Sequence, residues 1–170
     1  MTERVIVIFP RFSNPEPLHR LRSRFDPLAR EIDLHLTLVF PFQSTLTTLE
    51  LERHLVGAVK GMRPFPILLR DITGHDWEYL FLNVKQGNDS LIELHDRLYT
   101  GPLQPHFRQD HTFLPHLTVG RVRNPVTFHE ALRTAAAVQE CFETMVTEVV
   151  TYTIDDDGRR GVELTVPLSE

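Results

Sequence analysis

The chain has 170 residues, of which 41% are hydrophobic and 24% are charged, as is typical of one globular domain. Its net charge of −5 argues against a protein that coats long duplex nucleic acid, because binding along a phosphate backbone needs a basic surface. The N-terminal sequence gains charge too early for a signal peptide and no apolar run reaches the ~20 residues of a membrane span, so we expect a cytoplasmic protein without a membrane partner.

Hydrophobic periodicity and capping signals divide the first half of the chain into helices and strands. Asn14 followed by Pro15 predicts the start of one helix, and Thr47 with Glu50 forms a capping box that predicts the start of another. The predicted elements are a strand over 4–9, a helix over 15–26, a strand over 35–40, a helix over 47–62, and a hairpin of strands over 65–73 and 79–84.

The same order of elements recurs in the second half. Asp89 or Ser90 predicts the start of a helix, and Thr127 with Glu130 forms a second capping box. The predicted elements are a helix that ends before Gly101, a strand over 116–122, a helix from 127, and a hairpin of strands over 147–154 and 162–166.

The repeated order predicts an α+β fold with two lobes. Residues 1–170 would form a single domain of two pseudo-symmetric halves, approximately 1–86 and 87–170, each with the order helix, strand, helix, strand, strand. Each half would bury its helices against an antiparallel sheet, and the two sheets would line a central cleft.

The candidate catalytic motif is a His-Leu-Thr sequence that occurs twice, beginning at His35 and at His116. Side chains alternate between the two faces of a strand, so the leucines would point into the core. Each histidine would then share the opposite face with its threonine, Thr37 or Thr118. A symmetric approach of the two strands would place all four polar groups around one ligand.

These four groups suit the cleavage of a phosphate ester. Histidine has an ordinary pKa of ~6.5, so one imidazole can act as base while another acts as acid near neutrality. Each proton transfer contributes roughly 10²–10⁴ in rate, and threonine hydroxyls can donate hydrogen bonds to the phosphate oxygens. A lone strand histidine is more often structural, but the matched pair favours catalysis.

Residues 35–42 and 115–121 resemble the two signature motifs of the two-histidine (2H) phosphoesterases, which include bacterial 2'-5' RNA ligase-like proteins. The resemblance implies a bilobal fold and action on 2',3'-cyclic phosphates or 2'-5' phosphodiesters of nucleotides or RNA ends, with no metal and no other cofactor. It also implies that His35 and His116 are catalytic and that Thr37 and Thr118 hold the phosphate.

Two further residues are weaker candidates for contact with a substrate. Phe42 lies just beyond the first motif and could stack on a base. Arg121 follows the second motif and could contact a phosphate, although a salt bridge or solvent exposure is an equally good interpretation.

Two other functions stay open at this point. Intact acid–base residues favour an enzyme over a non-catalytic module that binds phosphorylated nucleotides or RNA ends. His106, His111 and His116 would allow a metal hydrolase, but their spacing is not typical of a metal site. The remaining histidines, among them His75 and His95, are expected to lie on the surface or to cap helices.

Overall fold

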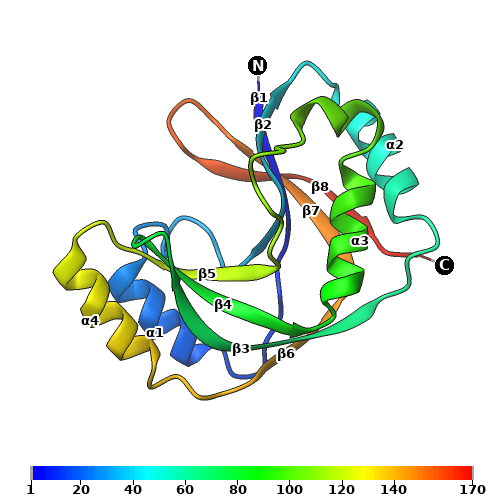
Figure 1. Ribbon diagram of the computed structural model, residues 1–170. Helices are drawn as coiled ribbons and strands as arrows, with labels where there is room; N and C mark the ends of the chain where they lie inside the picture. The colour runs from blue at the N-terminus through cyan, green and yellow to red at the C-terminus, as the bar shows by residue number, and fades with distance from the viewer. Residues whose placement is uncertain (1, 170) are drawn as a thin grey trace.

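The computed structural model describes residues 2–169, whose strands form two four-stranded antiparallel sheets covered by helices (Figure 1). None of the helices in this part of the chain is long and apolar enough to cross a membrane. The elements are β1 (Thr2–Ile8), α1 (Glu16–Phe25), β2 (Leu36–Ser44), α2 (Thr48–Val59), β3 (Phe65–His75), β4 (Tyr79–Gln86), α3 (Asn88–Leu98), a 3₁₀ helix (Gly101–His106), β5 (His116–Arg121), α4 (Pro125–Ala135), β6 (Phe142–Val146), β7 (Glu148–Ile154) and β8 (Arg160–Pro167).

Each sheet is covered by two helices, which makes two lobes. In the first lobe the strand order is β2-β1-β7-β8, with α2 packed on β8 and α3 packed on β2. In the second lobe the order is β5-β4-β3-β6, with α1 packed on β5 and α4 packed on β3. Figure 1 shows α1 and α4 side by side under the second sheet, away from α2 and α3. The predicted α+β bilobal architecture is confirmed.

The lobes do not coincide with the two halves of the sequence. Strands β3 and β4 come from the first half, but β4 pairs with β5 and β3 with β6 of the second half. Strands β7 and β8 come from the second half, but β7 pairs with β1 and brings β8 into the first sheet. A boundary near residue 86 therefore divides the two copies of the repeated pattern, but each sheet contains strands from both sides of that boundary. The short strand β6, which the sequence pattern did not predict, completes the second sheet beside β3.

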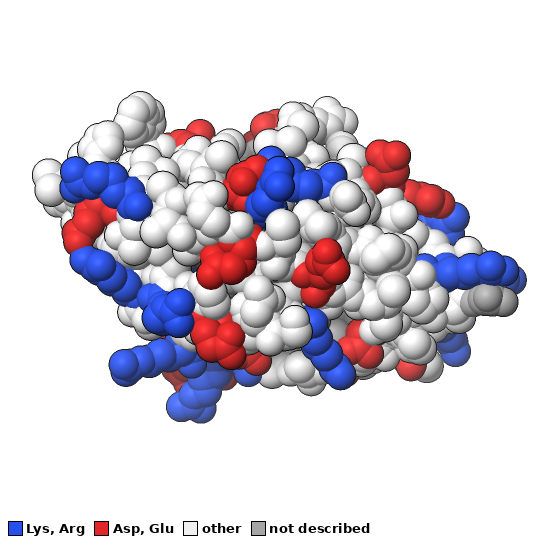
Figure 2. Space-filling view, turned by 90° about the horizontal axis from the view of Figure 1, so that it is seen from below, with Lys and Arg blue, Asp and Glu red and all other residues white. Residues whose placement is uncertain are grey.

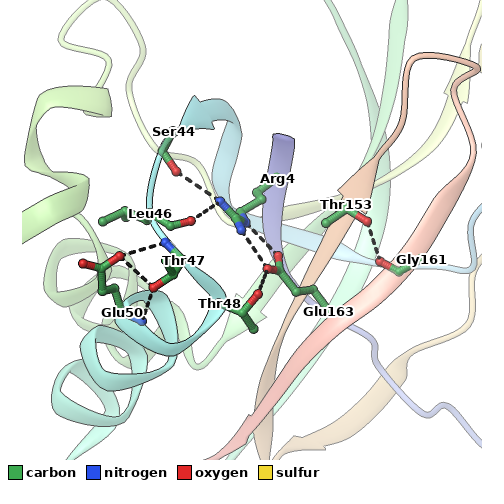
Figure 3. Close-up of polar contacts among 9 residues, drawn as sticks. All are labelled: Arg4, Ser44, Leu46, Thr47, Thr48, Glu50, Thr153, Gly161 and Glu163. Carbon is green, nitrogen blue, oxygen red and sulfur yellow. Dashed lines mark hydrogen bonds and ion pairs between the residues drawn. The ribbon is translucent and has the colours of Figure 1, made fainter. Parts of the chain in front are cut away.

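The two predicted capping boxes have different outcomes. The first is confirmed, because Glu50 donates its backbone N–H to the Thr47 hydroxyl at 3.2 Å and accepts from the Thr47 N–H at 2.8 Å (Figure 3). The second is wrong: α4 begins at Pro125, and the Asn124 side chain accepts the backbone N–H of Thr127 at 3.1 Å. Proline suits the first helical position since its N–H would be unpaired there anyway, and this fixes the start of α4 two residues earlier.

Two other helix starts also differ from the prediction. Pro15, and not Asn14, precedes α1, while the Asn14 side chain donates to the Cys141 carbonyl at 3.3 Å. Asp89 and Ser90 lie inside α3, which begins after Gly87 in a left-handed conformation with φ 90°. Glycine adopts that angle at little cost, so the chain reverses from β4 into α3 without a side-chain cap.

A buried ion pair crosses the first sheet from β1 to the edge strand β8. Arg4 on β1 donates to both carboxylate oxygens of Glu163 on β8, at 2.7 and 2.8 Å, and to the Leu46 carbonyl at 3.0 Å (Figure 3). Thr48 at the start of α2 donates to Glu163 at 2.7 Å. These hydrogen bonds, first among them the one from Arg4, lower the pKa of Glu163, so the pair stays ionised and ties β1, β8 and α2 together.

Candidate active site

The two His-Leu-Thr strands are the edge strands through which the lobes meet. β2 is at the edge of the first sheet, β5 is at the edge of the second, and the two are in contact. The apolar residues of both motifs are buried in the core: Leu36, Leu38, Leu117 and Val119. The histidine and threonine of each motif are only partly buried and alternate with these apolar residues along the strand, as the pattern predicted.

Both motif histidines make the same hydrogen bond to the backbone. Nδ1 of His35 lies 2.8 Å from the carbonyl of Asp33, and Nδ1 of His116 lies 2.6 Å from the carbonyl of Leu114. A carbonyl oxygen can only accept, so Nδ1 must carry the proton in each ring. The neutral tautomer therefore has its lone pair on Nε2, which is the atom that can accept a proton from a reactant.

The environment disfavours a positive charge on either imidazole. Burial is the main cause that lowers the pKa of His35, and the positive charge of Arg22 lowers it further. Burial also lowers the pKa of His116, and the charges of His75 and His35 add to this effect. His35 is thus among the charged groups that act on His116, as expected from the contact between β2 and β5. Both imidazoles are therefore mainly neutral at pH 7.

The side chains that border the two histidines are different. The His116 ring stacks on Phe81 of β4, with 3.6 Å between the ring centroids and 22° between the planes. The His35 ring has edge or tilted contacts instead, at 6.2 Å from Phe9 and 6.4 Å from Tyr152 of β7. Phe81, Phe9 and Tyr152 were not predicted as site residues, because contacts between separate strands leave no mark in a local sequence pattern.

Arg160, at the start of β8, brings a further positive charge near His35. Its Nη1 atom donates to the Glu31 carboxylate at 2.8 Å, and its charge contributes to the lowered pKa of His35. Burial raises the pKa of Tyr152, and Arg160 opposes this rise. Arg160 lies 125 positions after His35 in the sequence, so only the return of β8 to the first sheet brings them together.

The structure corrects the interpretation of Phe42. This side chain is only 4% exposed and packs in the core beside the His106 ring, with 5.2 Å between centroids. Phe42 pairs with Arg4 across β1 and β2, and paired residues share a face of the sheet, here the one that carries the buried ion pair. Its ring is therefore not available to stack on a base.

For Arg121 the structure shows the salt-bridge alternative. Its Nε atom donates to Glu78 at 2.7 Å, and its guanidinium lies 5.3 Å from the centre of the Tyr79 ring. Arg123 donates to the same carboxylate at 3.1 Å. These bonds lower the pKa of Glu78, first through Arg121. A phosphate contact by Arg121 stays a prediction.

The three histidines spaced by five residues, from the end of the 3₁₀ helix to the start of β5, have different partners. His106 contacts Phe42, His111 lies 5.7 Å from the Phe40 ring, and His116 stacks on Phe81. Within residues 2–169, no three histidine, cysteine or carboxylate side chains gather as a metal ion would require.

His95 is not a surface residue, contrary to the prediction. It is 4% exposed, stacks on Phe113 with 3.8 Å between centroids, and donates from Nδ1 to the Leu38 carbonyl of β2 at 2.8 Å. Tyr99, also on the α3 side, accepts the N–H of Phe40 at 3.1 Å. His95 of α3 and Tyr99 at its C-terminal cap therefore fix the backbone of β2 by hydrogen bonds from the side of α3.

Comparison with known proteins agrees with this arrangement. A family model described as the 2'-5' RNA ligase superfamily matches residues 9–158. Relatives that carry the provisional name phosphoesterase include one from Geobacillus thermodenitrificans, 31% identical over 68% of this chain and 67% of the relative. Another, from Bacillus licheniformis, is 27% identical over 68% of this chain and 69% of the relative.

Solved structures share the fold over nearly the whole chain. E. coli LigT complexed with 3'-AMP has a TM-score of 0.60 and 19% identity, covering 99% of both chains. Usb1 from Kluyveromyces marxianus has a TM-score of 0.54 and 10% identity, covering 98% of both chains. At these identities the likeness shows a common fold.

Proposed function

This chain belongs to the 2'-5' RNA ligase superfamily, and from that premise we propose that it is a metal-independent phosphoesterase that acts on 2',3'-cyclic phosphates or 2'-5' phosphodiesters of nucleotides or RNA ends. One observation carries the proposal. Two His-Leu-Thr strands from different lobes lie in contact, and each fixes its imidazole by the same Nδ1 bond to the backbone. A histidine with a purely structural role is not expected to recur, with the same hydrogen bond from Nδ1, on the strand that contacts it.

Hydrolysis of a 2',3'-cyclic phosphate uses one imidazole as base and the other as acid. The neutral ring accepts a proton at Nε2 from the attacking water, whose oxygen forms the new bond to phosphorus. The protonated ring donates its Nε2 proton to the ribose oxygen as the old P–O bond breaks. Strain in the five-membered cyclic ester makes the leaving oxygen easier to displace, so the reaction does not depend on a metal ion.

Thr37 and Thr118 hold the phosphate for this displacement. Their hydroxyl groups donate hydrogen bonds to the two non-bridging oxygens, on which negative charge increases in the transition state. One threonine from each lobe grips the group from two sides, so the attacking and leaving oxygens are aligned with the two imidazoles.

The proposed substrates are small or are ends of RNA chains. In Figure 2, several Lys and Arg side chains gather at the lower left, but Asp and Glu are spread over the rest of the face shown, which has no basic band from end to end along which a long duplex would bind. LigT, which shares the fold, has been solved with 3'-AMP and with NADP+, which supports a nucleotide as the ligand of this protein.

The test is turnover by the purified protein of 2',3'-cyclic AMP and of a 2'-5'-linked adenosine dinucleotide, with and without excess EDTA. We expect hydrolysis of at least one substrate at the same rate in both conditions. Tight binding of both nucleotides without turnover would instead identify a binding module. Loss of activity with EDTA and its return with a divalent cation would identify a metal hydrolase.

A further inference from the structure

Three aromatic rings form a continuous stack that ends at the candidate active site. His75, at the end of β3, stacks on one side of Phe81, with 4.8 Å between centroids and 21° between planes. His116 stacks on Phe81 at 3.6 Å and 22°. Phe81 is therefore held between two imidazoles, and only one of them belongs to a His-Leu-Thr motif.

The backbone fixes each ring of this stack. Phe81 pairs with Thr118 in the β4–β5 ladder, and its neighbours Leu80 and Leu82 are buried, so its side chain must emerge on the face of the sheet that carries His116. The register of β4 and β5 therefore sets the positions of Phe81 and His116.

The hairpin that carries His75 is anchored on the other side of the sheet. Gly74 packs on α4 so closely that a Cβ atom there would lie 2.9 Å from the Phe128 ring. The turn that follows holds Asp76 and Trp77 in the left-handed region, at φ 51° and 56°. These constraints bring His75 back over Phe81, where its Nε2 lies 3.2 Å from Asp76.

The first lobe has no equivalent of this stack. The residue opposite Thr37 in the β1–β2 ladder is Val7, where the second lobe has Phe81 opposite Thr118. His35 has only edge or tilted contacts with aromatic rings, at more than 6 Å between centroids. A parallel ring restrains an imidazole to one plane, whereas an edge contact at that distance does not.

We propose that Phe81, backed by His75, is a positioning residue that holds the plane of the His116 ring for proton transfer. The proposal rests on the proposed function. The single bond from His116 Nδ1 to the Leu114 carbonyl fixes one atom of the ring but leaves the ring free to tilt about it. The stack removes that freedom and keeps Nε2 aimed at the reacting oxygen. A misplacement of about 1 Å in a reacting group lowers rates by roughly a hundredfold.

The charge of His75 also acts on the pKa of His116. Burial lowers this pKa first, the charge of His75 lowers it further, and the charge of His35 follows. Other charged groups of the hairpin form pairs: Glu78 of the turn with Arg121, and Lys85 of β4 with Asp71 of β3. Asp76 of the turn lies 3.2 Å from Nε2 of His75.

The first experiment replaces Phe81. Phe81→Leu keeps an apolar side chain on β4 but removes the ring, and we expect kcat for 2',3'-cyclic AMP to fall about tenfold to a hundredfold with little change in KM. Phe81→Tyr restores a ring and should recover most of the rate. Phe12→Leu makes the same change at a ring that packs on Phe142 and lies outside the stack, so it is the matched control and should keep the wild-type rate. Equal rates for Phe81→Leu and the wild type would overturn the proposal.

The second experiment replaces His75 and observes His116 directly by NMR. His75→Phe keeps the stack without the charge, so we expect kcat to persist while the pKa of His116 rises toward its ordinary value. His75→Ala should raise that pKa as well and also lower kcat. An unchanged pKa of His116 in both variants would refute the coupling.

NMR also separates this inference from the proposed function. The His116 ring protons lie against the Phe81 face, so their resonances should be shifted upfield by the ring current in the wild type and not in Phe81→Leu. This holds whether or not the wild type turns over any nucleotide tested. An inactive wild type with these shifts would refute the phosphoesterase and retain the stack. Absence of the shifts in an active wild type would refute the stack alone.

Discussion

The two motif strands β2 and β5 present the same reacting groups in different surroundings. Each carries a histidine whose Nδ1 donates to the carbonyl two residues before it, and each is the edge strand of its sheet. His116 stacks on Phe81, whereas His35 is bordered by Tyr152 and by the charge of Arg160. The repeat thus specifies the two histidines of the proposed acid–base pair, and the strands beside them make their surroundings unequal.

The two lobes also differ in how their charges are buried. In the first lobe Arg4 and Glu163 form a pair with side chains 6% and 12% exposed. In the second lobe Arg121 and Glu78 form a pair that is 37% and 26% exposed. When one partner of a buried ion pair is removed, the other keeps an uncompensated charge. When one partner of an exposed pair is removed, water solvates the charge that is left. We therefore expect loss of one partner to destabilise the protein more at the pair of the first lobe than at the pair of the second.

The largest expected effect tests the equality of the two motifs. His35→Ala and His116→Ala should each lower kcat/KM by at least about a hundredfold, because each removes one of two proton transfers. The double variant should be little worse than either single variant, since the two residues act as a unit. Rates come from hydrolysis of 2',3'-cyclic AMP, with circular dichroism as the control for folding. Full activity in either single variant would contradict a catalytic role for that histidine and thus the equivalence of the two motifs.

The contrast between the ion pairs is tested by unfolding in urea. Glu163→Gln should lower the free energy of unfolding by about 2–3 kcal/mol, because Arg4 keeps its charge in a buried place without a carboxylate. Glu78→Gln is the matched variant in the second lobe and should leave the midpoint of unfolding unchanged. Similar losses in both variants would show that burial does not distinguish the two pairs.

The threonines should contribute equally if the phosphate is gripped from both lobes. Thr37→Val and Thr118→Val keep the shape of the side chain and remove one hydrogen bond to a charged oxygen, which corresponds to roughly tenfold to hundredfold in kcat/KM. A loss confined to one variant would place the phosphate on one strand only.

The smallest effect concerns pH and the support of β2. Burial lowers the pKa of His95, as it does for His35 and His116, so the folded chain binds fewer protons than the unfolded chain below pH ~6.5. The contribution of these neutral histidines to the free energy of unfolding is thus fully present above that pH. It is lost as the pH falls below it, by at most about 1.4 kcal/mol per pH unit for each such histidine.

His95→Gln isolates one part of this loss. Glutamine can still donate to the Leu38 carbonyl but cannot be protonated, so the variant should lose less stability than the wild type between pH 6.5 and 5, as measured by urea unfolding at each pH. His129→Gln, at an exposed position of α4, is the control and should follow the wild type. Identical slopes for His95→Gln and the wild type would contradict this role.

Local signals predicted what depends on neighbours in sequence. Alternation along β2 and β5 correctly placed the leucines in the core, and the capping box at Thr47 is present with both of its hydrogen bonds. The second box failed because two caps compete there: Asn124 followed by Pro125 starts α4 before Thr127 can do so. The prediction considered only the Thr127 box and missed the start at Asn124 and Pro125.

The remaining features depend on contacts between distant strands. Hydrophobic alternation says which face of a strand is buried but not which strand lies beside it, so the exchange of β3–β4 and β7–β8 between halves left no signal. The surroundings of the histidines follow from that exchange. Phe81 reaches His116 through the β4–β5 ladder, and Tyr152 reaches His35 through the return of β7. A sequence repeat can therefore identify the candidate reacting groups of a site, but it does not identify the side chains from other strands that surround them.

The most direct test is a crystal structure of the protein with bound 3'-AMP. We expect one phosphate group to lie within hydrogen-bond distance of Nε2 of both His35 and His116, with a threonine hydroxyl from each strand on its oxygens. A phosphate that touches one motif only, or that binds outside the contact between β2 and β5, would contradict a site shared by the two lobes.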